Sequence, residues 1–336
     1  MPKEATHWIL AKQTWQAMPD GLLKTKIRGN KALYYLGAIA FDTPYYVLTG
    51  KNRSDLYAAA QRLHSYNADS SFNPFELLVK SSETLPEGYQ PFLAGALTHI
   101  AADAVFHPFI YYFSGSNENV PSDQATRATA RHRRLETALD MYFFKREEGA
   151  AFKNLCLTDL YRKRENEEKA FLKLLNLLYF GKFLVKDFSL KLAVRQHAII
   201  HILIHHKWIH RFLETLDILW PGQALWLQPI EALFYATCQD TDPNFSQQSF
   251  AYRHPVTGEE RHESINDLQA RMVTQSLTFL EIIDNIDRQE DLKKRLAGAV
   301  FPSLYHGLPP DQNVKMHFFD ILQPLYPNNE DILYRT

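Results

Sequence analysis

The chain has 336 residues, of which 46% are hydrophobic and 22% charged, so it can bury a sizeable core and shows no compositional sign of disorder. Its 37 basic and 38 acidic side chains give a net charge of −1, which excludes attraction to nucleic acid or to an anionic membrane by bulk electrostatics. The two cysteines, Cys156 and Cys238, exclude a disulfide scaffold and a zinc cluster held by thiolates.

The first seven residues (MPKEATH) lack the apolar core of a signal peptide. The longest apolar stretch, residues 193–220, is interrupted by arginine, lysine and histidine side chains, so it does not have the composition of a membrane span. We therefore expect a soluble, cytoplasmic protein without an integral membrane span.

The content of glycine and proline is low, at 13 and 17 residues, and apolar residues recur at intervals of three and four, which predicts an all-α fold. Turn residues divide the chain into expected helices at residues 7–17, 31–40, 54–64, 74–80, 90–112, 129–146 and 266–287, with further helices across 151–223. Residues 114–128, a candidate lid, and residues 241–260 are predicted to be irregular.

We expect two parts in the chain. Residues 1–150 are predicted to form a compact multi-helix core that carries the site. Residues 151–336 are predicted to form a carboxy-terminal helical extension packed on that core, either as a second unit or as part of one continuous domain.

Three polar side chains, His99, Asp103 and His107, interrupt the apolar segment 90–112. Their spacing of four residues puts them within about 80° of one another on one helical face. Burial of a carboxylate and two imidazoles among apolar residues is costly unless a partner compensates, and a divalent cation compensates all three. His132 and Glu136 repeat the spacing on the next helix, and zinc takes imidazole nitrogen and carboxylate oxygen as ligands.

Each pair alone has a simpler interpretation. A histidine and an aspartate four residues apart on a helix are more often hydrogen-bonded than metal ligands. The arginines beside His132 favour a solvated, charged helix face at that position. Both pairs within 40 residues, the first in an apolar helix, favour metal binding over these alternatives.

At this point the sequence resembles the zinc-dependent phospholipase C family, which includes the single-strand-specific zinc nucleases. The residues that carry the resemblance are THWILA at 6–11, YLGAIAFD at 35–42, Leu63-His64, GALTHIAADAVFHP at 95–108, His132 and Glu136. HPVTGE at 254–259, followed by the helix expected at 266–287, resembles the carboxy-terminal part of intracellular bacterial relatives.

The resemblance implies packed helices around two or three zinc ions that hydrolyse phosphodiesters with an activated water. It implies a first zinc held by His64, His99 and Asp103, and a second held by His107, His132 and Glu136. Asp103 would bridge towards a third zinc that also takes His7. Asp42 would either ligate the first zinc or act as the catalytic base that orients the attacking water.

The chain departs from the family pattern in two places. Secreted members have five residues between the bridging aspartate and the next histidine, whereas Asp103 and His107 are separated by three, as in the His-Pro form of bacterial relatives. Secreted members also use the free amine of an exposed tryptophan as a ligand, and this chain has no such tryptophan. Removal of Met1 would expose the amine of Pro2 instead, five residues ahead of His7.

Other polar groups are weighed and set aside. His197, His201 and His205 also recur at intervals of four, but without a carboxylate on that face, so we interpret them as hydrogen-bonded core histidines. Four arginines near the expected lid are interpreted as solvated charges rather than phosphate contacts: Arg127, Arg131, Arg133 and Arg134. Tyrosines near the motifs could line a pocket, though core packing is the simpler role: Tyr45, Tyr46, Tyr66 and Tyr112.

The sequence thus predicts a zinc-dependent phosphodiester hydrolase of the phospholipase C type. Its substrate would be a phosphodiester such as a phospholipid or its headgroup, with nucleic acid a weaker candidate, and the oligomeric state is left open. The alternative is a non-catalytic helical protein in which zinc is structural and the carboxy-terminal half supports an interaction surface.

Overall fold

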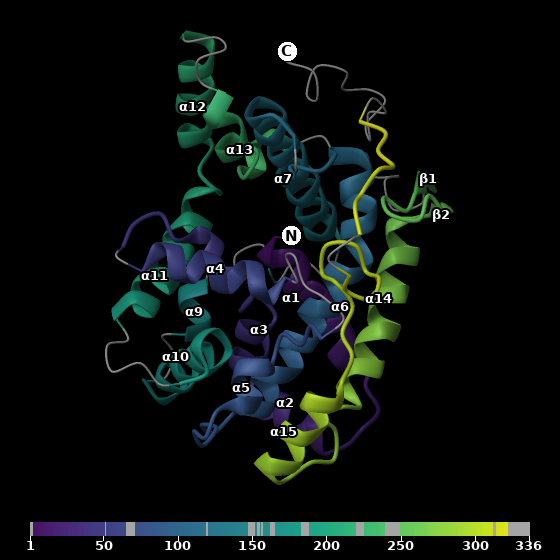
Figure 1. Cartoon of the computed structure of the whole chain (residues 1–336). Helices are drawn as coiled ribbons and strands as arrows, with labels where there is room; N and C mark the ends of the chain where they lie inside the picture. Colours follow the sequence, from purple (N-terminus) through teal and green to yellow (C-terminus); the bar gives the residue numbers. More distant parts are fainter. Residues whose placement is uncertain are drawn as a thin grey trace.

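The computed structural model describes residues 3–321 except 51, 65–70, 119, 147–151, 153–154, 156, 162–164, 183–187, 220–224, 239–248 and 312–313. The described residues are mostly helical, as the apolar periodicity predicted (Figure 1). The amino-terminal half contains α1 (Glu4–Ala17), α2 (Leu22–Gly29), α3 (Lys31–Gly37), η1 (Thr43–Tyr46), α4 (Arg53–Leu63), α5 (Glu76–Lys80), α6 (Tyr89–Ser114) and α7 (Ser122–Lys145).

Further helices follow, with one small sheet. They are α9 (Leu157–Tyr161), α10 (Glu165–Phe180), α11 (Phe188–Leu203), α12 (Lys207–Leu219), η2 (Leu225–Leu227), α13 (Gln228–Glu231), η3 (Tyr235–Cys238), α14 (Ile265–Leu280) and α15 (Gln289–Gly298). The sheet is an antiparallel hairpin of β1 (Phe250–Arg253) and β2 (Glu260–Glu263).

The hairpin corrects the expectation of an irregular segment at 241–260, of which residues 241–248 lie outside the described part. Phe250 and Tyr252 alternate with exposed residues and pack their rings against Phe109 of α6, which is the period-two pattern of a half-buried strand. Gly258 adopts a φ of +72° in the connection between the strands. The segment carries too few apolar residues for its sequence alone to have shown this pattern.

Helix α6 is the centre of the fold. It contacts α1, α3, α7 and α14, and nearly all of its side chains are buried (Figure 1). Among the described residues it is the one helix long and apolar enough to cross a membrane, but its apolar window is entirely buried inside the protein. The three polar side chains predicted on this helix therefore lie in the interior.

Two glycines bring α3 and α6 into close contact. A Cβ atom on Gly37 would lie 2.0 Å from the carbonyl oxygen of Phe92, and one on Gly95 would lie 2.0 Å from that of Tyr34. Only glycine allows the two backbones to approach this closely. The contact places the turn after α3, which carries Asp42, beside the polar face of α6.

The expected loop at 114–128 is wrong in length, because residues 122–128 belong to α7. Pro121 precedes the helix and Asp123 lies in its first turn, where a carboxylate interacts favourably with the helix dipole. The connection between α6 and α7 is therefore too short to be the long lid that the sequence suggested.

Candidate metal centre

His99, Asp103 and His107 lie on one face of α6, as their spacing predicted. Nε2 of His99 is 3.2 Å from Oδ2 of Asp103, and Nε2 of His107 is 4.0 Å from Oδ1 of the same carboxylate. All three side chains are buried. The carboxylate thus lies between two imidazoles in the interior of the protein.

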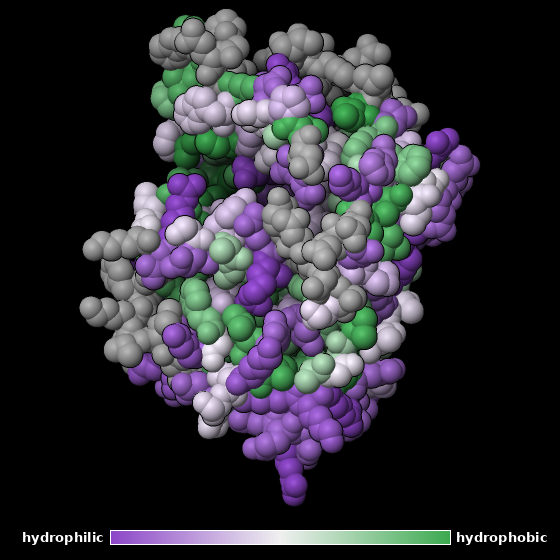
Figure 2. All heavy atoms as spheres, viewed as in Figure 1, coloured by the Kyte–Doolittle hydropathy of each residue, from purple (hydrophilic) through white to green (hydrophobic). Residues whose placement is uncertain are grey.

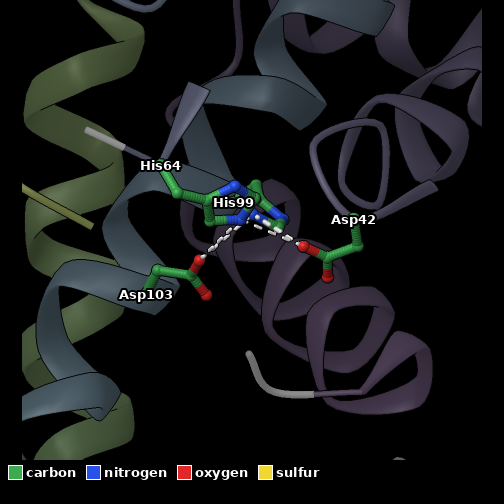
Figure 3. A group of neighbouring side chains, drawn as sticks. All are labelled: Asp42, His64, His99 and Asp103. Carbon is green, nitrogen blue, oxygen red and sulfur yellow. Dashed lines mark hydrogen bonds and ion pairs between the residues drawn. The ribbon is translucent and has the colours of Figure 1, made fainter. Parts of the chain in front are cut away.

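Asp42 and His64 complete a first group around this carboxylate. His64, at the end of α4, places Nε2 at 3.2 Å from Oδ1 of Asp42 and 3.6 Å from Oδ2 of Asp103. Figure 3 shows the two carboxylates reaching the imidazoles of His64 and His99 from opposite sides. One ligand atom from each of the four residues lies within 4.8 Å of all the others, a spacing that can hold a metal ion.

A second group joins α6 to α7. It consists of His107, His132 and Glu136, whose ligand atoms also lie within 4.8 Å of one another. Nε2 of His132 is 3.0 Å from Oε1 of Glu136, and the rings of His107 and His132 are 5.5 Å apart. The structure therefore brings together the same sets of residues that the resemblance assigned to two zinc ions.

His7 of α1 lies beside the first group. Its Nε2 is 3.5 Å from Oδ2 of Asp42 and 3.6 Å from Oδ1 of Asp103, and its ring stacks on that of His99 at 4.2 Å. His7 therefore lies near Asp103, and the third site in which the two would share an ion stays a prediction. The predicted amine of Pro2 falls on residues 1–2, outside the described residues, so that ligand stays a prediction.

Backbone carbonyl groups orient three of the imidazoles. Nδ1 of His64 donates to the carbonyl of Ala60 at 2.8 Å, and Nδ1 of His99 donates to that of Ala38 at 2.9 Å. Nδ1 of His107 donates to the carbonyl of Leu304. A carbonyl oxygen can only accept, so the proton of each neutral ring is on Nδ1 and the lone pair of Nε2 points into the group, as metal ligation requires.

These three carbonyls are functional groups that sequence reasoning missed. A backbone carbonyl carries no residue-type signal. The carbonyl of Leu304 lies 197 residues from His107 along the chain, so no local motif could have indicated it.

Several buried ligand atoms lack a hydrogen-bond partner, and this shows whether the residues suit a cation. Among the described residues these include Nε2 of His99, Nε2 of His107 and both carboxylate oxygens of Asp103. Buried polar atoms are rarely left without a hydrogen bond, and exceptions need an explanation such as an ion. The donor set of imidazole nitrogens and carboxylate oxygens is the one that zinc prefers, so the residues fit the metal.

The pKa values of these residues agree with a cation-binding site. Burial disfavours a charge on His99, but the carboxylates of Asp103 and Asp42 outweigh burial and raise its pKa to about 9. Burial lowers the pKa of His7 to about 4 and that of His107 to about 3. The centre thus favours a positive charge among the carboxylates and keeps most of its imidazoles neutral, the form that binds metal.

Side chains from both groups line one cavity of about 850 Å³. His64 of the first group and all three members of the second group line it, together with Arg133. Tyr45 and Tyr46 also line this cavity, whereas Tyr112 packs on Tyr252 of the hairpin and Tyr66 lies outside the described residues. A site that opens onto a cavity leaves room for water and substrate, whereas a structural zinc site is closed by protein ligands.

The comparison with protein families shows the family of the chain. Residues 6–185 match the family described as zinc dependent phospholipase C, and all eight candidate ligands lie within this range. The chain belongs to the zinc-dependent phospholipase C family. Comparisons with curated proteins and with solved structures give no significant match. Membership of this family of hydrolases, with the two buried groups, indicates a metal-dependent phosphodiesterase.

The second histidine series of this phospholipase C family member forms no metal group of its own among the described residues. His197 is buried, with Nε2 at 2.6 Å from Oε1 of Glu4 and Nδ1 at 3.2 Å from Oγ1 of Thr43. His201 is buried against Trp8, whereas His205 is exposed. The interpretation as core histidines therefore fits the first two, and the carboxylate that the helix itself lacks comes from α1.

Arg133 differs from the solvated charge that the sequence suggested. It is half-buried, lines the cavity, and donates from a guanidinium nitrogen to the carbonyl of Pro229 at 2.8 Å. Arg131 donates to the carbonyl of Ser114, also at 2.8 Å. The neighbouring arginines could not be told apart from the sequence, because several arginines in a row on α7 do not reveal which of them faces inward.

Proposed function

We propose that the protein is a phospholipase C that binds two or three zinc ions and cleaves the phosphodiester bond of a phospholipid. The observation that carries the proposal is that two groups of imidazole and carboxylate ligands lie beside one cavity, which His64 of the first group and all members of the second group line. The match to the zinc-dependent phospholipase C family supports the reaction class and implies a phospholipid substrate.

The ligand sets follow from the two groups. His64, His99 and Asp103 would hold the first zinc, with Asp42 as a fourth ligand or as the base. His107, His132 and Glu136 would hold the second, and His7 with Asp103 would hold a third. Zinc, when bound, supplies positive charge that neutralises phosphate oxygens and lowers the pKa of a water molecule.

The protein's own residues have separate tasks. As a base, Asp42 would accept a proton from the attacking water at one of its carboxylate oxygens. Arg133 attracts the anionic phosphate into the cavity, where its low exposure strengthens the attraction. Tyr45 and Tyr46 close one wall of the cavity and limit the water that reaches the reacting atoms.

The proposal is tested by zinc analysis of the purified protein, followed by hydrolysis of 4-nitrophenyl phosphocholine. Asp42→Asn should lose most of the turnover, and Asp55→Asn, which changes an exposed aspartate of α4, should keep it. Bound zinc with background turnover in all proteins, also against phospholipid, would support the non-catalytic alternative with structural zinc. Protein without bound zinc would contradict both. The intracellular bacterial branch and the cytoplasmic location remain predictions, and fractionation of the source cells would test the location.

A further inference from the structure

Two chemically different sets of side chains line the cavity. The first set consists of His64 and the three members of the second metal group, together with Arg133. The second set, here called the apolar end, consists of apolar side chains of α11, α12 and the segment around α13: Ile200, Leu203, Ile204, Ile209, Leu213 and Phe234. These helices begin after residue 185, where the match to the phospholipase C family ends. The apolar end is therefore a feature that family membership does not assign.

An occupant that fills this cavity must be amphiphilic. Its polar end must carry negative charge to suit metal ions and a guanidinium, and its other end must be hydrocarbon to suit a wall of isoleucine and leucine. A volume of about 850 Å³ is large for a phosphate headgroup alone, because pockets of this size enclose whole drug-sized ligands. Nucleic acid does not fit this pattern, because its sugar and phosphate groups would lie on an aliphatic wall.

The surface beside this wall is also apolar. Trp208 and Phe212 of α12 are 69% and 59% exposed, and Ile199 and Ile202 of α11 are 54% and 42% exposed. Figure 2 shows hydrophobic side chains around α12, above a hollow in this face of the molecule. Apolar side chains of this size gathered on a surface mark an interaction site, and these lie on the same two helices that line the apolar end of the cavity.

We propose that the apolar end of the cavity binds one hydrocarbon chain of the lipid while its phosphate lies at the metal centre. This inference rests on the proposed function, because it takes the metal centre as the site that binds the phosphate. The subsite makes the enzyme select substrates by chain length. Ile200 and Leu213 are specificity-determining residues, because they come from two different helices and face the same space.

The test uses the zinc-loaded full chain and calorimetric titration with inorganic phosphate and with butyl, hexyl and octyl phosphate, below their micellar concentrations. Affinity should rise with chain length, because each methylene that is fully buried strengthens binding about fourfold. We expect the octyl-to-butyl affinity ratio to be about tenfold or more in the unchanged protein. Ile200→Asn and Leu213→Asn should reduce this ratio.

The matched control is Val300→Asn, an equally polar change at an exposed apolar residue after α15 that does not line the cavity, which should keep the ratio. The ratio is measured within each variant, so a loss of metal or of folded protein cancels. Equal affinities for butyl and octyl phosphate in the unchanged protein would overturn the inference and leave the proposed function standing. Failure to bind inorganic phosphate would overturn the proposed function itself, and a chain-length effect without hydrolysis would support a lipid-binding site that is not catalytic.

Discussion

The imidazole of His107 donates from Nδ1 to the backbone carbonyl of Leu304, which lies in the segment after α15. The same segment makes a second contact with α6. Pro108 has no N–H group, so the carbonyl of Ala104 lacks its helical hydrogen bond, and Gly307 packs against it. A Cβ atom on Gly307 would lie 2.2 Å from that carbonyl oxygen, and its φ of +70° disfavours other residues. The orientation of His107 therefore depends on a glycine.

Gly307→Ala should weaken zinc binding at the second group. The added methyl group pushes the segment from α6 and moves the carbonyl of Leu304 away from His107. Loss of such an orienting partner typically lowers metal affinity about 10–100-fold. Competition with a zinc chelator should show one weakened ion, with the ion at the first group unchanged. Gly298→Ala, at a glycine with open space around it, should leave both affinities unaltered; equal weakening in the two variants would contradict the argument.

Asp42→Asn distinguishes the two roles left open for this carboxylate. A base transfers a proton in the rate-limiting step, and its loss lowers kcat by about 10²–10⁴-fold while zinc content stays the same. A ligand contributes to affinity, so its loss lowers zinc content at the first group as well. Because Oδ1 is 3.2 Å from His64 and 3.5 Å from His99, we expect loss of zinc together with turnover. Full zinc occupancy in an inactive variant would assign Asp42 as the base.

The sequence predicted the composition of the centre better than its surroundings. His99, Asp103 and His107 were found because a regular helix converts a spacing of four into one face, and because charge in an apolar segment is costly. The prediction that His64, Asp42 and His7 lie beside this face came from the family resemblance. Spacing within one helix does not show which other segments approach that helix. The structure brings these side chains together as the resemblance implied.

What the sequence could not predict is set by long-range packing. The carbonyl of Leu304 and the inward position of Arg133 depend on the approach of distant segments. Helix α2 was missed because Leu22–Gly29 has few apolar residues, and only Leu23 and Ile27 are buried. The apolar end of the cavity has the composition of any buried helix, so no pattern separates residues that face a cavity from residues that face the core.

Gly95→Ala should destabilise the whole fold, because its methyl group would meet the carbonyl of Tyr34 on α3. The colliding atom belongs to the backbone and cannot rotate away, so we expect a loss of about 3 kcal/mol in the free energy of unfolding, the upper range for overpacking. Urea denaturation measures the loss. Gly29→Ala is the matched control, since nothing lies near that position and alanine favours the helix. A control as unstable as Gly95→Ala would show that the contact between α3 and α6 is not the cause.

The buried pair of Glu4 and His197 should make stability depend on pH. Burial alone would raise the pKa of Glu4, but the hydrogen bond and charge of His197 outweigh burial and hold this pKa well below its usual value of 4.5. A carboxylate with a lowered pKa stabilises the fold fully above its unfolded pKa. The contribution is then lost as the pH falls towards the folded pKa.

Glu4→Gln should therefore cost about 1.5–3 kcal/mol at pH 7, the range for a buried hydrogen bond to a charged group. The difference from the unchanged protein should narrow as the pH falls below 4.5, because Glu4 of the unfolded chain then takes up a proton. Urea unfolding at pH 7, 5.5 and 4, at one zinc concentration, measures this convergence. Glu76→Gln, which removes an exposed pair with Lys80, should change stability by less than about 1 kcal/mol at each pH. A constant difference between Glu4→Gln and the unchanged protein would mean that lost packing, rather than lost charge, explains the effect.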